Sequence, residues 1–136
     1  MIGRQKVNLE GAIVDNPTEL VENAGQALVN HDWPQALDLF NHSLAVLGMA
    51  GDELTANLVA EAQNGKGVAL LEMERYGEAV KALEAALLIK PDMAGAYYNL
   101  GLAWEGLGRL DEALHSYNQA IQLEPNDGEA YFRRQG

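Results

Sequence analysis

Cysteine is absent from the 136-residue chain, and basic residues are scarce. Without a thiol, the chain forms no disulfide and offers no thiolate ligand to a metal. Nine Lys and Arg stand against 20 Asp and Glu, which gives a formal net charge of −11 at pH 7. Because phosphate backbones and anionic lipid surfaces are bound by clustered basic side chains, this balance predicts neither a nucleic-acid partner nor membrane binding.

A long hydrophobic run is also missing. No stretch of about 18 apolar residues occurs in the sequence, so no membrane insertion is expected. Arg4 and Lys6 place two positive charges near the start, but the segment after them is too polar for the core of a signal peptide. Together with the absence of cysteine, these features predict a cytoplasmic protein.

Apolar residues recur at steps of three and four through most of the chain, which indicates helices. β-Branched residues are few and strict alternation is absent, so we expect the whole chain to be α-helical. Cap and breaker residues, such as Asn16 before Pro17 and Asp32 before Pro34, mark where helices begin. The predicted helices cover residues 17–30, 33–47, 52–74, 77–89, 93–107, 110–123 and 127–135.

The sequence also repeats itself. Three pairs of landmarks are each 34 positions apart: Ala79 and Ala113, Pro91 and Pro125, and Gly67 and Gly101. Small residues are expected where two helices cross closely, and Pro is expected to end the second helix of each unit. One unit cannot bury its own apolar face, so neighbouring units are expected to stack on one another.

The residues that carry this period resemble the tetratricopeptide repeat, a 34-residue helix–turn–helix unit. The clearest copy matches the whole family pattern with Tyr97, Leu100, Gly101, Trp104, Ala113, Tyr117, Ala120 and Pro125. The copy before it departs at Gln63 and Lys66, where an aromatic and an aliphatic residue are usual. If its turn at 30–32 is one residue short, a more degenerate first copy holds Gly25, Leu28, Ala36, Phe40 and Ser43.

The spacing of the first two copies is irregular. Ala36 and Ala79 are 43 positions apart, so extra residues are inserted near 48–58, either as an extension of the third helix or as a protruding loop. A fourth copy starts near Gly128 and keeps an aromatic residue at Tyr131, but it has Arg134 where Leu is usual.

The resemblance implies an all-α fold, namely a right-handed superhelical array of about three helix–turn–helix repeats plus a terminal helix. It divides the chain into a poorly patterned N-terminal segment, 1–16, and a repeat domain, 17–136. The approximate units of that domain are 17–50, 52–92, 93–126 and a partial unit, 127–136.

Catalytic chemistry has little support in the sequence. His31, His42 and His115 are far apart and show no metal-ligand spacing, so we expect surface histidines. The stretch 65–67 reads Gly-Lys-Gly, but it lacks the upstream Gly and the following Ser or Thr of a phosphate-binding loop. No Ser, His and Asp arrangement stands out. We therefore predict a protein that is not an enzyme, with no metal and no cofactor.

In tetratricopeptide arrays the first helix of each unit lines a concave face, so the resemblance implies a peptide-binding groove. The groove positions in this chain are Asn64, Val68, Leu71, Tyr98, Asn99, Leu102, Glu105, Phe132 and Arg133. Tyr98, Leu102 and Phe132 are expected to form an apolar stripe, and Asn64 and Asn99 to hydrogen-bond a peptide backbone. The alternative is that these residues only pack between repeats or face solvent.

One known use of the family is a clamp for the C-terminal carboxylate of chaperone tails. Only Asn99 and Arg133 match the positions of that clamp in this chain. Asn64 and Val68 stand where Lys and Asn are required, and Glu129 reverses a required positive charge. A chaperone tail is therefore not the expected ligand, because an acidic groove favours basic or neutral segments.

The predicted function is a non-catalytic module that binds a protein or peptide segment, as an adaptor or assembly factor. Two alternatives stay open. One is a structural module that self-associates into a homo-oligomer through exposed end faces, since the last apolar face of an array needs a cover. The other is a regulatory fragment of a larger protein.

Overall fold

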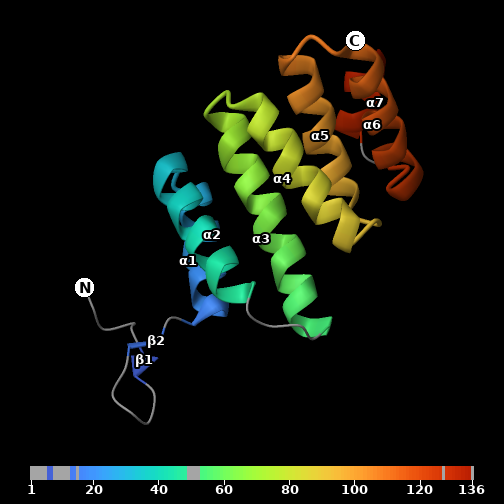
Figure 1. The fold of residues 1–136 in the computed structure, drawn as a ribbon. Helices are drawn as coiled ribbons and strands as arrows, with labels where there is room; N and C mark the ends of the chain where they lie inside the picture. Colours follow the sequence, from blue (N-terminus) through green and yellow to red (C-terminus); the bar gives the residue numbers. More distant parts are fainter. Residues whose placement is uncertain (1–5, 8–12, 15, 49–52, 127, 136) are drawn as a thin grey trace.

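The structure is a row of paired helices preceded by a short hairpin (Figure 1). This computed structural model describes residues 6–7, 13–14, 16–48, 53–126 and 128–135, with the side chains of residues 6–7, 13–14, 129, 131 and 135 outside the description. The expected roles of Glu129 and Tyr131 therefore lie outside the described residues. The helices are α1 (Pro17–Val29), α2 (Trp33–Leu47), α3 (Glu53–Glu72), α4 (Tyr76–Ile89), α5 (Ala94–Gly106), α6 (Leu110–Leu123) and α7 (Gly128–Gln135).

Each helix packs against the next one along the chain, and α3 also contacts both α1 and α5. The first helices of the successive pairs therefore lie along one side of the array, which Figure 1 shows as a layered stack. Buried alanines at the crossings, including Ala62, Ala79 and Ala96, let the helices approach closely. The predicted fold class, an all-α array of helix–turn–helix repeats, is confirmed.

The predicted helix limits agree with the observed ones to within two residues, and the side-chain caps predicted for α1 and α2 are formed. The Oδ1 atom of Asn16 accepts hydrogen bonds from the backbone N–H groups of Thr18 at 2.9 Å and Glu19 at 3.3 Å. Asp32 caps α2 in the same way, through the N–H of Gln35 at 3.2 Å.

The N-terminal segment corrects the expectation that the whole chain is helical. The strands β1 (Lys6–Val7) and β2 (Ile13–Val14) pair antiparallel, with Lys6 opposite Val14 and Val7 opposite Ile13. Two residues per strand are too few for alternation to be visible in the sequence, although Val and Ile favour extended backbone.

The three turns between paired helices are alike, which corrects the expectation of a shorter first turn. His31, Glu74 and Gly108 occupy the same place in the three turns, with φ angles of 60°, 59° and 74°. The next backbone N–H donates to the carbonyl five residues back, at 2.8 Å in each case: Asp32 to Ala27, Arg75 to Leu70 and Arg109 to Trp104. This left-handed residue closes each first helix in the manner of a Schellman motif.

Because the three turns have equal length, the helix crossing of the first repeat lies one residue earlier in the chain than expected. Ala24 is fully buried and takes the crossing position, whereas a Cβ atom on Gly25 would meet nothing within 4 Å. In the next repeat a Cβ on Gly67 would lie 2.6 Å from Leu83 Cδ2. The expectation that glycine permits close crossing is therefore confirmed for Gly67 and is wrong for Gly25.

The insertion between the first two repeats lengthens a helix. Helix α3 has 20 residues, whereas α1 and α5 have 13 each. The extra residues from Glu53 onward continue α3 toward its N-terminus, which is the first of the two alternatives for this segment. Residues 49–52 lie outside the described residues.

Candidate binding surface

The nine predicted groove residues lie on three helices that share one side of the array. Asn64, Val68 and Leu71 belong to α3, Phe132 and Arg133 belong to α7, and the other four belong to α5. Most of these side chains are half-buried, whereas Phe132 is 79% exposed.

A shallow hollow of about 350 Å³ brings four of these residues together. Its lining consists of Leu71, Glu72, Tyr76, Leu102, Glu105, Gly106 and Arg133. Leu71 and Leu102 form its apolar part, and Glu72, Glu105 and Arg133 supply its charged groups. Three helices that are separated in the sequence thus contribute to one site, together with the first residue of α4.

The shape of this hollow depends on Gly106. A Cβ atom at this position would lie 2.5 Å from Cδ1 of Tyr76, so only glycine lets the tyrosine ring lie against α5. Tyr76 and Glu72 were not among the residues predicted from the sequence. Tyr76 and Gly106 lie close together but belong to different repeats. A short sequence motif therefore could not have predicted their contact.

Glu105 is the centre of a polar cluster beside the hollow. The hydroxyl of Tyr117 donates a hydrogen bond to Glu105 Oε1 at 2.6 Å, and Arg133 Nη1 lies 3.7 Å from Glu105 Oε2. The ring of Tyr98 lies 5.9 Å from that of Tyr117, measured between centroids. The cluster links α7 to α5 and α6, so Arg133 both lines the hollow and pairs with a residue of α5.

The electrostatics of the cluster follow from burial and pairing. Burial, together with the hydrogen bond to Glu105, raises the pKa of the Tyr117 hydroxyl far above its ordinary value. Burial acts to lower the pKa of Arg133, but its hydrogen bond to Tyr98 and its electrostatic interactions with Tyr98, Tyr117 and Glu105 together outweigh this and raise the pKa. Sequence reasoning assigned Tyr117 to the repeat core alone and gave no signal for its hydroxyl bond.

The two predicted asparagines meet across the helices. Nδ2 of Asn99 donates to Oδ1 of Asn64 at 3.5 Å, which joins α5 to α3 in a half-buried position. Their predicted contact with a peptide backbone is a separate role and stays a prediction.

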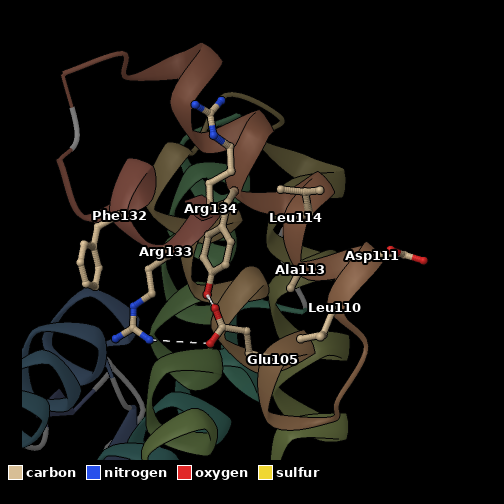
Figure 2. Close-up of a pocket in the computed structure, with 9 residues that line it drawn as sticks. Glu105, Leu110, Asp111, Ala113, Leu114, Phe132, Arg133 and Arg134 are labelled. Carbon is tan, nitrogen blue, oxygen red and sulfur yellow. Dashed lines mark hydrogen bonds and ion pairs between the residues drawn. The ribbon is translucent and has the colours of Figure 1, made fainter. Parts of the chain in front are cut away.

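The three residues of the predicted apolar stripe have different surroundings. Leu102 lines the hollow between α3 and α5, and Tyr98 packs on Tyr117. Phe132 lines a second hollow of about 460 Å³ between α6 and α7, where Figure 2 shows its ring at the side opposite Leu114.

Other chemistry is not indicated in the described part of the chain. The three histidines are exposed, and no group of three or more His, Asp or Glu side chains there is placed to hold a metal ion. Among the described helices, none is both long and apolar enough to cross a membrane.

Comparison with known proteins places these features in context. A family model described as "Tetratricopeptide repeat" matches residues 64–130. The Hsp70-Hsp90 organizing protein 3 of Arabidopsis thaliana is 29% identical over 115 residues, which is 84% of this chain. The match covers 21% of that relative, so the chain spans about a fifth of its length.

Two solved structures show the same fold. The Arabidopsis OM64 TPR domain superposes with a TM-score of 0.79 at 24% identity, covering 88% of this chain and 91% of that domain. The first TPR of Spaghetti (RPAP3), bound to the HSP90 peptide SRMEEVD, has a TM-score of 0.78 at 18% identity, with 95% and 91% covered.

Proposed function

Because the chain belongs to the tetratricopeptide-repeat family, we propose that it binds a protein or peptide segment on the side formed by α3, α5 and α7. In this proposal the chain is a cytoplasmic adaptor or assembly factor and catalyses no reaction. The observation that carries the proposal is the hollow of about 350 Å³ in which Leu71, Leu102, Glu105 and Arg133 meet. Residues from three helices converge there, so the hollow is a feature of the packed array rather than of one repeat.

The chemistry of the hollow suggests what it binds. Leu71 and Leu102 offer apolar contact for one side chain of a ligand, and Glu72 is an exposed acid at the edge. Arg133 is already paired with Glu105, so the positive charge is partly neutralised within the protein. With a net charge of −11, the chain attracts basic segments over long distances. The proposed ligand is therefore an apolar residue flanked by Lys or Arg.

An acidic chaperone tail fits this surface poorly. The HSP90 peptide SRMEEVD is bound by the related RPAP3 domain. In this chain Asn64 is a neutral amide that is bonded to Asn99. The charge of Arg133 is paired with that of Glu105. Neither position therefore offers a free positive charge to an acidic tail. We expect calorimetric titration with SRMEEVD to show no binding, whereas saturable binding would contradict the proposed ligand class.

The proposal is tested by selecting peptides from a random displayed library on the immobilised protein. Selected peptides are then titrated against Glu72→Lys and Leu102→Glu, which reverse one charge and remove one apolar contact of the hollow. Glu84→Lys and Leu88→Glu are matched controls, because both residues are exposed on α4 and neither lines this hollow.

The expected result is a loss of affinity of tenfold or more for each hollow variant, and unchanged affinity for both controls. Circular dichroism verifies that each variant remains helical. Equal affinity for all four variants would show that the ligand binds elsewhere and would refute the proposed surface.

A further inference from the structure

A third hollow, lined by α4, α5 and α6, combines apolar side chains with acids. Its volume is about 350 Å³. Helix α5 contributes the apolar part of the lining, namely Tyr97, Leu100 and Trp104. The second helices of two repeats contribute the polar part, which consists of Glu84 on α4 and Asp111, Glu112, His115 and Ser116 on α6. We call this site the acidic hollow.

Two of the three acids have no basic partner in the described part of the chain. Arg109 donates a hydrogen bond to Glu112 at 2.8 Å, so the charge of Glu112 is balanced within the protein. Glu84 and Asp111 are exposed, and neither forms an ion pair with a described residue. Figure 2 shows the carboxylate of Asp111 pointing away from Glu105. The acidic hollow therefore keeps two negative charges that a ligand can neutralise.

A buried hydroxyl also opens into the acidic hollow. Ser116 is 2% exposed and lines this hollow, and its side chain forms no hydrogen bond with a described residue. Among the described residues no side-chain oxygen is both closed off from solvent and unpaired, so that of Ser116 reaches the hollow. By contrast, the buried hydroxyl of Ser43 is bonded to the carbonyl of Phe40 at 2.8 Å. Because buried polar groups are normally paired, Ser116 offers an open hydrogen-bonding position to a ligand.

The preceding repeat places its own lysines where the acidic hollow has none. The 34-residue period relates Glu112, Leu100 and His115 to Glu78, Lys66 and Lys81, respectively. In that repeat the hydrogen bond from Arg75 lowers the pKa of Glu78, and the charges of both lysines act in the same direction. Ammonium groups thus lie near the acid of the preceding repeat, whereas the lining of the acidic hollow contains no lysine.

We propose that the acidic hollow binds the side chain of a lysine that belongs to a partner protein. An ammonium group carries one positive charge and three N–H donors. The acceptors that the hollow offers it are the carboxylates of Glu84 and Asp111 and the hydroxyl of Ser116. The carbon chain of lysine is apolar, so it is expected to lie along Tyr97 and Trp104. Opposite charges on the two sides of the contact make it selective for a cation.

Arginine is less suited to the acidic hollow than lysine. Cζ of Arg109 lies 5.5 Å from the centroid of the Trp104 ring, and the same guanidinium is bonded to Glu112. The chain itself therefore already places a planar cation on this ring. A compact ammonium group needs no stacking surface and can reach the acids at the edge of the hollow.

The first test follows the indole N–H signals of the two tryptophans by NMR while the capped tripeptide acetyl-Ala-Lys-Ala-amide is added. Trp104 lines the acidic hollow and Trp33 does not, so only the Trp104 signal is expected to shift and to saturate. The same peptide with norleucine in place of lysine keeps the carbon chain without the charge and is expected to cause no saturable shift. The peptide with arginine is expected to bind about fivefold more weakly than that with lysine.

Variants of the two unpaired acids locate the bound lysine. Glu84→Gln/Asp111→Asn is expected to weaken binding of the lysine peptide by about tenfold, because both charges of the site are removed. The matched control is Asp38→Asn/Glu61→Gln. It removes the same charge from exposed residues of α2 and α3 that do not line the acidic hollow. This control is expected to bind like the original protein.

Ser116→Ala tests the buried hydroxyl. We expect binding of the lysine peptide to weaken by about threefold, because the ammonium loses one acceptor. Ala82 is buried at the equivalent position of the preceding repeat, so an alanine fits in such surroundings. Circular dichroism verifies that each variant remains helical.

A Trp104 signal that does not move would overturn the proposal. So would equal binding of the norleucine peptide, or tighter binding of the arginine peptide. If both charge variants weakened binding equally, the peptide would be responding to net charge alone, which would also refute the site. Full affinity of Ser116→Ala would refute the assigned acceptors.

This inference stands apart from the proposed peptide surface, because the acidic hollow shares no lining residue with the hollow between α3 and α5. A ligand of that other hollow is weakened by Glu72→Lys and unaffected by Glu84→Lys. The lysine tripeptide is expected to respond in the opposite way. Either proposal can therefore fail while the other holds.

Discussion

Tyr117 lies so close to Gly101 that a Cβ atom on the glycine would come within 2.4 Å of Cε1 of the tyrosine ring. Gly67 and Leu83 have the same relationship one repeat earlier, with a closest approach of 2.6 Å. Both pairs join the first helix of a repeat to its second helix. The small residue of the repeat pattern is therefore a steric requirement set by a particular partner.

Gly101→Ala is expected to lower the free energy of unfolding by about 2 kcal/mol. The added methyl group displaces a buried ring, and this outweighs the gain of about 1 kcal/mol in helix propensity. Gly25→Ala is the matched control, because its Cβ meets nothing within 4 Å and it is expected to stabilise the protein. Urea unfolding monitored by circular dichroism measures both. A stabilising Gly101→Ala would refute the contact.

Glu74→Gly is expected to raise the free energy of unfolding by about 1 kcal/mol. Glu74 has a φ of 59°, a left-handed conformation that is costly for a residue with a side chain and that glycine adopts freely. Gly108→Ala, at the equivalent turn position with a φ of 74°, is expected to cost a similar amount. Chemical denaturation of both variants tests this. A stabilised Gly108→Ala would show that the two turns are not equivalent.

Tyr117→Phe is expected to change how stability depends on pH. The pKa of Tyr117 is raised by burial and by its bond to Glu105, whereas an unfolded tyrosine loses its proton near pH 10. Its contribution is fully present below pH 10 and is lost as the pH rises, because only the unfolded chain readily releases the proton.

The variant is accordingly expected to be about 1–2 kcal/mol less stable at pH 7, through loss of the bond to Glu105. From pH 9 to 11 its stability should fall less steeply than that of the original protein. The free energy of unfolding by urea, measured at each pH, checks both effects. Parallel curves for the two proteins would contradict the raised pKa.

Ser43→Ala is expected to change the free energy of unfolding by less than about 0.5 kcal/mol. Ser43 is fully buried, and its hydroxyl donates to the carbonyl of Phe40 at 2.8 Å. Ala86 and Ala120 occupy the same place in the other repeats, so the surroundings accept a methyl group. The acceptor of the Ser43 hydroxyl is a backbone carbonyl within a helix. Removing the hydroxyl therefore leaves little hydrogen-bonding capacity unsatisfied. A loss above about 1.5 kcal/mol would show that the hydroxyl is needed.

The sequence by itself determined the features that depend on neighbours along the chain. Asn16 and Asp32 cap their helices as predicted, and the 34-residue period placed the helices and the crossing glycine at Gly101. These are short-range effects, since caps and helix propensity act within one turn of backbone. The first repeat matches the pattern poorly. Its alignment alone therefore could not decide whether Ala24 or Gly25 lies at the helix crossing.

The tertiary structure alone decided which residues meet. Tyr117 with Glu105, Asn64 with Asn99 and Tyr76 with Gly106 are contacts between different helices. The repeat pattern places each residue on a helix face, but the partner depends on how neighbouring helices are rotated and offset when they pack. For the same reason only the packed array shows that Leu114 is exposed, whereas Val80, its equivalent in α4, is buried.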